Sequence, residues 1–314
     1  RLPEGFEIQL VAAEPEIDKP MNLAFDTQGR LWISSSIEYP YAAEEGQGRD
    51  KISILEDTDA DGHADRITTF ADGLNIPIGL YPYRDGVVVY SIPNIWFLRD
   101  TDGDGECDNG GAQDGRVGDT AGSSPNIWFL RDTDGVGVCD QREVLYGPLG
   151  DPVDTHGLQN AFRRGFDGWL YICHGFRNES TVRGDDGSEI TMQSGNTYSV
   201  RLDGSRVEQF TWGQVNPFGS TFTPEGDLIT ADCHSKPLTL LVRGGYFPSF
   251  GKPHDGLGFV PSIMEHSHGS TAIAGAAFYD GDGFPEPWRN SLYVGNVITA
   301  RVHRDVFVRH GSSV

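Results

Sequence analysis

The chain of 314 residues is poor in basic side chains and contains no long apolar run. Its 24 lysines and arginines stand against 46 aspartates and glutamates, which gives a formal net charge of −22. This charge argues against nucleic acid or an anionic membrane surface as a partner, because both require a basic face. Since no apolar run could span a bilayer, we expect no membrane span in this chain.

Cysteine is also scarce, with four residues that are too few for a disulfide scaffold. None of them has the CxxC spacing of a structural zinc site or of a c-type haem site. The chain is instead rich in turn-forming and aromatic residues, with 41 glycines, 18 prolines, 17 phenylalanines, 11 tyrosines and 6 tryptophans. This composition predicts an all-β fold of short strands joined by tight turns.

A weak unit recurs five times, and each copy has an apolar strand, a turn at glycine or asparagine, and a second apolar strand. The turn residues lie at positions 29, 86, 168, 226 and 290, with spacings of 57, 82, 58 and 64 residues. Such a period predicts a β-propeller, in which each blade packs against its neighbours. We expect residues 1–314 to form one propeller domain with five blades, and an N-terminal strand at residues 6–11 that could complete another. Six-bladed closure would need residues beyond Val314.

The long second spacing has a visible cause. Residues 91–108 and 123–140 are near copies, and residues 93–103 and 125–135 are identical at an offset of 32. Subtracting this offset from 82 leaves 50 residues, which restores the period. The segment 91–140 is therefore predicted to be one blade with an internal duplication.

Two acidic loops have carboxylates at positions 1, 3, 5 and 9 around a glycine at position 6. This pattern is typical of calcium loops, because alternate hard oxygen ligands can wrap a cation that takes six to eight of them. Neither loop has glutamate at position 12, so neither is a complete EF-hand, and a solvated acidic turn is the alternative. A third loop, residues 132–140, has Val136 at position 5 and is expected to bind calcium poorly or not at all. The predicted ligands are Asp57, Asp59, Asp61 and Asp65 in the first loop, and Asp100, Asp102, Asp104 and Asp108 in the second.

Three segments, residues 2–15, 55–62 and 70–75, resemble the membrane-bound dehydrogenase domain of planctomycetes and verrucomicrobia. That domain often precedes a haem-binding CxxCH module. Residues 213–219, 226–228 and 241–248 are similar to the glucose and sorbosone dehydrogenase propellers. Characterised members of this second family have six blades and use pyrroloquinoline quinone with calcium to oxidise sugars.

The resemblance implies a periplasmic or extracellular sugar or alcohol dehydrogenase that passes electrons to a cytochrome c-type haem partner. It places His156 as the catalytic base, although His156 could equally serve only to hydrogen-bond its loop. The residues expected around the cofactor are Asn216, His174, Asp232 and His234. The chain has Val215 where the sugar dehydrogenases have an arginine that could hold a quinone carboxylate. The alternative function is a non-catalytic propeller, stabilised by calcium, that binds carbohydrate or protein.

Two further dipeptides, Cys173-His174 and Cys233-His234, occupy matching places after core strands of successive units. The segment His266-Ser267-His268 precedes the next unit. Equivalent places on adjacent blades should face one another, which predicts a pocket rich in imidazole and thiol groups. A disulfide between the two cysteines, a transition-metal site and a pair of buried structural thiols all remain open.

Overall fold

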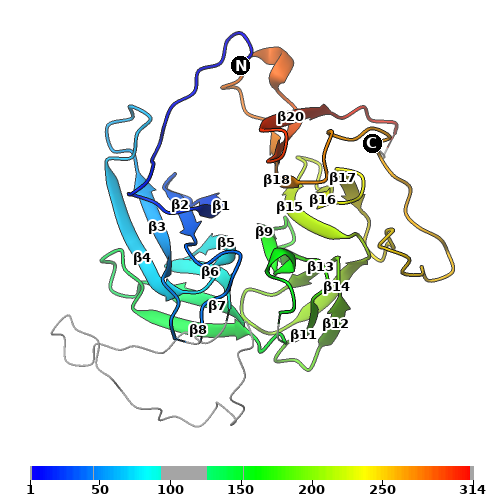
Figure 1. Ribbon diagram of the computed structural model, residues 1–314, viewed down its shortest axis with the longest axis horizontal. Helices are drawn as coiled ribbons and strands as arrows, with labels where there is room; N and C mark the ends of the chain where they lie inside the picture. Colours follow the sequence, from blue (N-terminus) through cyan, green and yellow to red (C-terminus); the bar gives the residue numbers. More distant parts are fainter. Residues whose placement is uncertain (1, 45, 93–125, 151, 312–314) are drawn as a thin grey trace. The chain divides into compact units, whose positions relative to one another are not determined.

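The computed structural model describes residues 2–44, 46–92, 126–150 and 152–311. Within these ranges nearly all regular structure is antiparallel β-sheet, and the prediction of an all-β, five-bladed β-propeller arrangement is confirmed (Figure 1). No helix in the described ranges is long and apolar enough to cross a membrane. The chain divides into two compact units, which we call the N-terminal unit (residues 10–155) and the C-terminal unit (residues 1–9 and 156–314).

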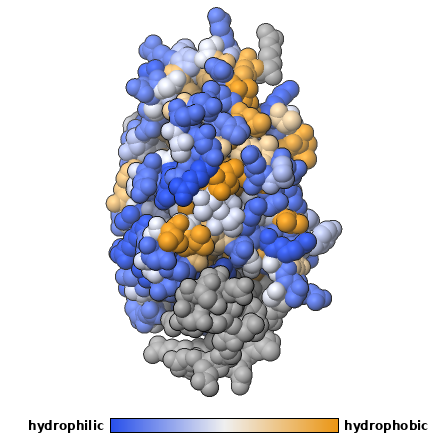
Figure 2. All heavy atoms as spheres, turned by 90° about the vertical axis from the view of Figure 1, so that its left-hand side faces the viewer, coloured by the Kyte–Doolittle hydropathy of each residue, from blue (hydrophilic) through white to orange (hydrophobic). Residues whose placement is uncertain are grey.

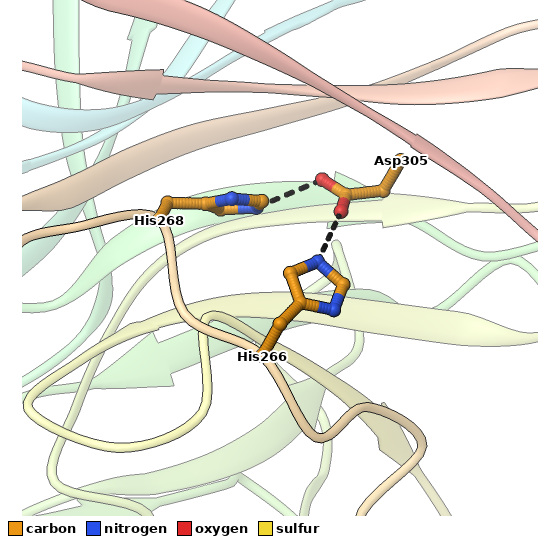
Figure 3. A group of neighbouring side chains, drawn as sticks. All are labelled: His266, His268 and Asp305. Atoms are coloured by element: carbon orange, nitrogen blue, oxygen red, sulfur yellow. Dashed lines mark hydrogen bonds and ion pairs between the residues drawn. The ribbon is translucent and has the colours of Figure 1, made fainter.

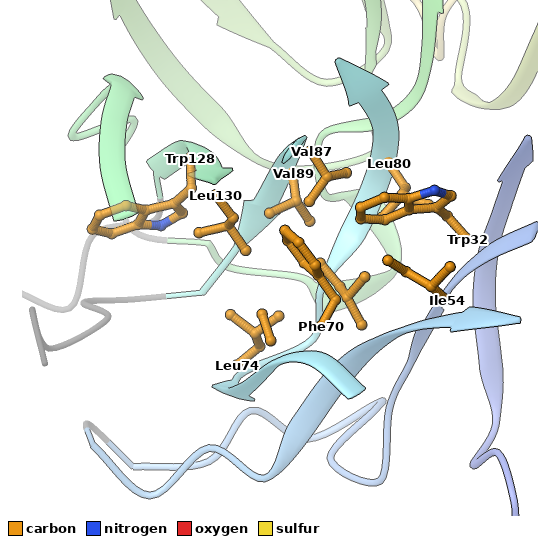
Figure 4. Close-up of a cluster of buried hydrophobic side chains, with 11 residues drawn as sticks. Trp32, Ile54, Phe70, Leu74, Leu80, Val87, Val89, Trp128 and Leu130 are labelled. Atoms are coloured by element: carbon orange, nitrogen blue, oxygen red, sulfur yellow. The ribbon is translucent and has the colours of Figure 1, made fainter. Parts of the chain in front are cut away.

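The N-terminal unit contains two four-stranded sheets, and in each the strands follow one another in sequence order. Large apolar side chains fill the space between the sheets, and the rings of Trp32 and Phe70 meet edge to face at 4.7 Å (Figure 4). Burial of such rings is the main stabilising contribution of the unit. The strands are β1 (Pro20–Phe25), β2 (Leu31–Ser35), β3 (Asp50–Glu56) and β4 (Arg66–Leu74), then β5 (Ile78–Tyr83), β6 (Gly86–Ser91), β7 (Asn126–Arg131) and β8 (Gln141–Tyr146).

The C-terminal unit contains one four-stranded sheet, two three-stranded sheets and a separate hairpin. The four-stranded sheet has the order β14-β13-β10-β9, and the hairpin β11–β12 is inserted between β10 and β13. Its strands are β9 (Asn160–Arg164), β10 (Leu170–His174), β11 (Glu179–Arg183), β12 (Glu189–Gln193), β13 (Asn196–Val200) and β14 (Val207–Trp212). The three-stranded sheets are β15 (Asn216–Phe222), β16 (Leu228–Cys233) and β17 (Leu238–Leu241), and β18 (Ile273–Tyr279), β19 (Ser291–Asn296) and β20 (Arg301–Val306).

In each of the five sheets other than the hairpin, the first strand along the chain has a register shift where it pairs with the second strand. These first strands are β1, β5, β9, β15 and β18. At four of the shifts a residue has the positive φ that suits glycine: Gly79, Ala161, Gly219 and Gly275. A Cβ atom at Gly219 would lie 2.7 Å from a backbone atom of Gly275, so these two bulges meet backbone to backbone. The bulges at Gly219 and Gly275 thus let the first strands β15 and β18 approach closely.

The five predicted strand pairs are confirmed as antiparallel pairs. Gly29, Gly168 and Gly226 lie in the turns, whereas Gly86 is the first residue of β6 and Asn290 ends the longer connection that contains η2 (Glu286–Trp288). The later copy of the duplicated stretch supplies β7, whereas the earlier copy at 93–103 lies outside the described residues. Residues 6–11 form no strand; the ring of Phe6 instead packs edge to face against Phe284 and Trp288 at 4.9 and 5.3 Å. That one domain spans residues 1–314 stays a prediction.

The surface is largely polar. Figure 2 shows a face that is mainly hydrophilic, with apolar side chains gathered in small separate patches. Small patches of this kind are ordinary on a protein surface and need no partner to cover them.

Candidate functional site

The buried carboxylate of Asp232, near the end of β16, fixes the start of β15. Its Oδ1 accepts the backbone N–H of Asn216 at 2.7 Å, and its Oδ2 accepts the N–H of Val215 at 3.1 Å. The hydroxyl of Ser235 donates to Oδ2 at 2.5 Å. Burial raises the pKa of the Asp232 carboxyl to about 6, although these three donors act in the opposite direction.

The side chain of Asn216 joins β15 to two loops. Its Nδ2 donates to the backbone carbonyl of His156 at 3.1 Å, and its Oδ1 accepts the N–H of Phe176 at 3.0 Å. His156 lies in the 3-10 helix η1 (Thr155–Gly157), directly before β9. Asn216 is only 8% exposed, so the loss of either bond would leave a buried polar group without its partner. The backbone of His156 is therefore held in one place.

Two glycines allow this close approach. A Cβ atom at Gly175 would lie 2.4 Å from Asn216 Oδ1, and one at Gly157 would lie 2.1 Å from the carbonyl oxygen of Phe176. Since real Cβ atoms never come so near, no other residue fits at either position without a backbone shift. The two loops are also joined directly, because the N–H of Gly175 donates to the carbonyl of Gly157 at 3.2 Å.

Two imidazoles of this region lie at the surface, those of His156 and His234. His234 follows β16 with a positive φ of 71°, and its ring lies 6.5 Å from that of Phe250. Phe250 also contacts the ring of Phe176 edge to face at 5.6 Å. The half-buried Lys252, two residues further on, donates from Nζ to the carbonyl of Gln193. Burial lowers the pKa of this ammonium group.

His174, which was expected to contact the cofactor, is fully buried as the last residue of β10. Its Nδ1 lies 2.7 Å from the carbonyl of Ser194, which can only accept, so Nδ1 carries the proton. Its Nε2 consequently accepts from the hydroxyl of Ser180 at 3.0 Å. Burial lowers the pKa of His174 to about 4, which keeps the ring neutral.

The chain of buried hydrogen bonds continues beyond His174. The hydroxyl of Ser180 accepts from Gln159 Nε2 at 3.0 Å, and Gln159 Oε1 accepts from the hydroxyl of Tyr198 at 2.8 Å. All these groups are satisfied within the protein, as buried polar groups require. His174 thus ties the hairpin β11–β12 to β10.

The cysteines of the described residues are free thiols, so Cys173 and Cys233 form no disulfide with each other. The Cys233 Sγ donates to the carbonyl of Ile273 at 3.1 Å, whereas Cys173 is fully buried near Thr197. Burial raises the pKa of Cys173 to about 12 and that of Cys233 to about 11. Both therefore stay protonated, as structural thiols do.

The histidines do not gather around these thiols as the matching positions predicted. His266 and His268 contact Asp305 of β20 instead, at 3.3 and 2.9 Å. Asp305 is the residue that the sequence analysis missed. Asp305 and His303 are two residues apart within 301–306, so they lie on the same face of a strand. This spacing is the pattern that could have indicated Asp305.

The first acidic loop brings three of its four predicted ligands together. A carboxylate oxygen from each of Asp57, Asp59 and Asp61 lies within 4.8 Å of the others. Asp65 instead accepts the N–H and hydroxyl of Thr58 at 2.7 and 2.8 Å, and these bonds lower the pKa of its carboxyl. The second loop, with Asp100, Asp102, Asp104 and Asp108, lies outside the described residues.

The third acidic loop has nearly the same geometry despite Val136. Carboxylate oxygens of Asp132, Asp134 and Asp140 also lie within 4.8 Å of one another. Asp140 accepts the N–H and hydroxyl of Thr133, in the same way as Asp65 accepts those of Thr58. The two loops therefore share the same Asx turns and the same Thr–Asp hydrogen bonds.

The β-propeller of this chain is of the kind seen in sugar dehydrogenases. A glucose dehydrogenase structure has a TM-score of 0.59 at 17% identity and covers 94% of this chain and 84% of that chain. Another glucose dehydrogenase has a TM-score of 0.56 at 16% identity, with 94% and 85% covered. The aldose sugar dehydrogenase of Streptomyces coelicolor, bound to pyrroloquinoline quinone, has a TM-score of 0.56 at 15% identity, with 93% and 78% covered.

The chain belongs to the family described as "Domain of unknown function (DUF7133)", whose pattern matches residues 1–112 and 117–314. A comparison with curated proteins found no match. The structural likeness, at such low identity, establishes the propeller fold alone.

The side chains present fit a quinone only in part. Asn216, His174 and Asp232 already direct their polar atoms to protein partners, so they could contact a quinone only by giving up these bonds. His234 lies at the surface, and the ammonium of Lys252 donates one hydrogen bond to Gln193 but has three donors, so these two groups could contact a carboxylated quinone without giving up a hydrogen bond within the described residues.

We predict that His174 makes the protein sensitive to acid. Between pH 6.5 and about 4 the unfolded chain binds a proton at this residue that the folded chain does not, so stability falls as pH falls. His174→Gln can keep both hydrogen bonds but has no titratable group. Between pH 7 and 4.5 the wild type should lose roughly 2–3 kcal/mol more than the variant in denaturant unfolding. Parallel pH profiles for the two proteins would contradict this assignment.

Proposed function

We propose that this chain is the dehydrogenase-like propeller domain of a protein that oxidises a sugar or another small alcohol. The observation that carries the proposal is the surface imidazole of His156, whose backbone is held by the buried side chain of Asn216. A base that removes a hydroxyl proton must be both accessible and fixed. The likeness of the fold to sugar dehydrogenases supports the same function.

In this proposal His156 accepts the proton of the substrate hydroxyl. The C–H bond of the carbon that carries this hydroxyl breaks in the same step. Histidine is the side chain most often used for such proton transfer, which contributes about 10²–10⁴-fold to the rate. Asn216 and Asp232 act as positioning residues, because the first holds the His156 carbonyl and the second holds the backbone of Asn216. A bound pyrroloquinoline quinone would supply the hydride acceptor, with His234 and Lys252 as its contacts.

The surroundings of this domain follow from the family resemblance. We propose that it works in the periplasm or outside the cell, and that a cytochrome c-type haem partner takes the electrons onward. Calcium in the acidic loops would fit such a location, because extracellular calcium keeps weak sites filled.

A second function, that of a non-catalytic propeller that binds carbohydrate or protein, is favoured by one observation. Val215 is buried and its N–H bonds to Asp232, so no guanidinium is available at the place where the sugar dehydrogenases have arginine. The stacked rings of Trp212 and Tyr246, whose centroids lie 5.1 Å apart, offer an aromatic surface of the kind that sugars contact.

The dehydrogenase proposal predicts quinone-dependent activity that requires His156. The purified protein, incubated with pyrroloquinoline quinone and calcium, should reduce an artificial electron acceptor when aldoses or simple alcohols are added. His156→Ala should lower kcat at least about 100-fold, because the base is lost. His310→Ala, at another surface histidine, should leave the rate unchanged. Failure of the wild type to bind the quinone or reduce the acceptor would favour the non-catalytic function.

Calcium binding by the acidic loops gives a separate prediction. A chelator should lower the melting temperature, because calcium bound only to the folded state stabilises it by mass action. Asp59→Ala should remove part of this effect, whereas Asp72→Asn, at an exposed aspartate outside the loops, should not. The measurement is a thermal melt with and without chelator. Identical curves would count against calcium in these loops.

A further inference from the structure

A cluster of two imidazoles and one carboxylate lies in the C-terminal unit, separate from the His156 region. His266 and His268 come from the loop before β18, and Asp305 comes from β20 (Figure 3). The Nε2 of His266 lies 3.3 Å from Asp305 Oδ1, and the Nε2 of His268 lies 2.9 Å from Oδ2. One potential ligand atom from each residue lies within 4.8 Å of the other two. Both imidazoles point toward the same carboxylate.

The local structure holds this cluster in place. The ring of His268 is 7% exposed and stacks on that of His303 at 4.1 Å, with an angle of 16° between the rings. His303 lies on the same face of β20 as Asp305, because side chains alternate along a strand. The amide of Asn296 at the end of β19 donates to the carbonyl of His268 at 2.9 Å. His268 is therefore ordered by contacts outside the cluster, as metal ligands usually are, and the backbone of Asp305 is held by the pairing of β20 with β19.

The donor set matches first-row divalent transition metals, which prefer imidazole nitrogen combined with carboxylate oxygen. With metal–ligand bonds of about 2.0–2.2 Å, tetrahedral ligands lie about 3.3–3.6 Å apart. The nitrogens of His266 and His268 lie 3.3 and 2.9 Å from different oxygens of the Asp305 carboxylate, and one ligand atom from each residue lies within 4.8 Å of the other two. The three groups are thus close enough for side-chain adjustments to bring one ligand atom from each onto a single ion.

A pocket opens on one side of the cluster. It has a volume of about 330 Å³, and both His266 and Asp305 line it. Its remaining wall is largely apolar and includes Leu238, Met264 and Phe307. Three protein ligands beside an open space are typical of sites where water or a small ligand completes the coordination.

We propose that His266, His268 and Asp305 bind a divalent transition-metal ion, such as Zn²⁺, with an open coordination position that faces this pocket. The ligand atoms are Nε2 of each histidine and one carboxylate oxygen. This site takes nitrogen and oxygen ligands, and is distinct in kind from the all-oxygen acidic loops of the N-terminal unit. It does not depend on the proposed dehydrogenase function.

The alternative is a hydrogen-bonded cluster that only connects the loop to β20. The two possibilities, a metal site and a hydrogen-bonded cluster, differ in what the side chain of His266 contributes to stability with and without a metal ion. That side chain is 63% exposed, and so exposed a pair adds little to stability by itself. Removal of His266 should therefore change the melting temperature of the metal-free protein very little, but should abolish the increase that a metal produces.

The test uses the full chain, stripped with chelator and then kept in millimolar Ca²⁺ so that hard-oxygen sites are filled. Zn²⁺ binding is measured by calorimetry, and Co²⁺ is used as a spectroscopic probe because its visible absorption bands strengthen when it passes from six-coordinate in water to a four- or five-coordinate protein site. We expect one ion per chain. We also expect affinity to weaken at least about tenfold in His266→Ala and in Asp305→Asn, with loss of the Co²⁺ bands.

The matched control is Glu265→Gln, which removes an exposed carboxylate beside His266 and should leave affinity unchanged. Circular dichroism and the metal-free melting temperature establish that each variant is folded. The proposal is overturned if the folded wild type binds neither Zn²⁺ nor Co²⁺ under these conditions. It is also overturned if folded His266→Ala and Asp305→Asn bind the ions as tightly as the control.

Discussion

The hydrogen bonds that satisfy the buried carboxylate of Asp232 are the constraint on which the candidate site depends. This carboxylate lies near the end of one strand and accepts the backbone N–H groups of Val215 and Asn216 at the start of its partner strand. Because a buried charge without partners is very costly, the two strand ends cannot separate cheaply. Asn216 then extends the constraint outward to the loops that contain His156 and Phe176. The backbone of His156 thus depends on buried groups from two other segments of the chain, those of Asp232 and Asn216.

The sheets were predictable because their determinants are local. A turn at Gly29, Gly168, Gly226 or Asn290 needs a residue that tolerates positive φ, and such residues stand out between apolar strands. The bulges were not predictable in the same way, since Ala161 has a side chain and still adopts a positive φ of 56° there. Its conformation follows from packing between neighbouring strands. Such packing cannot be predicted from the local sequence pattern.

The candidate site was predictable in its members but not in their roles. His174 and His234 follow core strands at matching places, and the sequence gives no reason to treat them differently. His174 is nevertheless interior, because β10 pairs with strands on both sides and the inserted hairpin supplies Ser180. His234 lies beyond the end of β16 and is exposed. Asp305 was missed because its histidine partners are 37 and 39 residues away, a separation that only the fold closes.

The central claim is that Asn216 holds the two loops together, and native-state hydrogen exchange of Asn216→Ala tests it most directly. Asn216 accepts the amide of Phe176, and the amide of Gly175 bonds across to Gly157. Both amides should exchange on the order of tenfold faster in the variant, while that of Ile229 in the middle of β16 keeps its protection. Unchanged exchange at Phe176 and Gly175 in a folded variant would show that other contacts position His156, and would contradict the account.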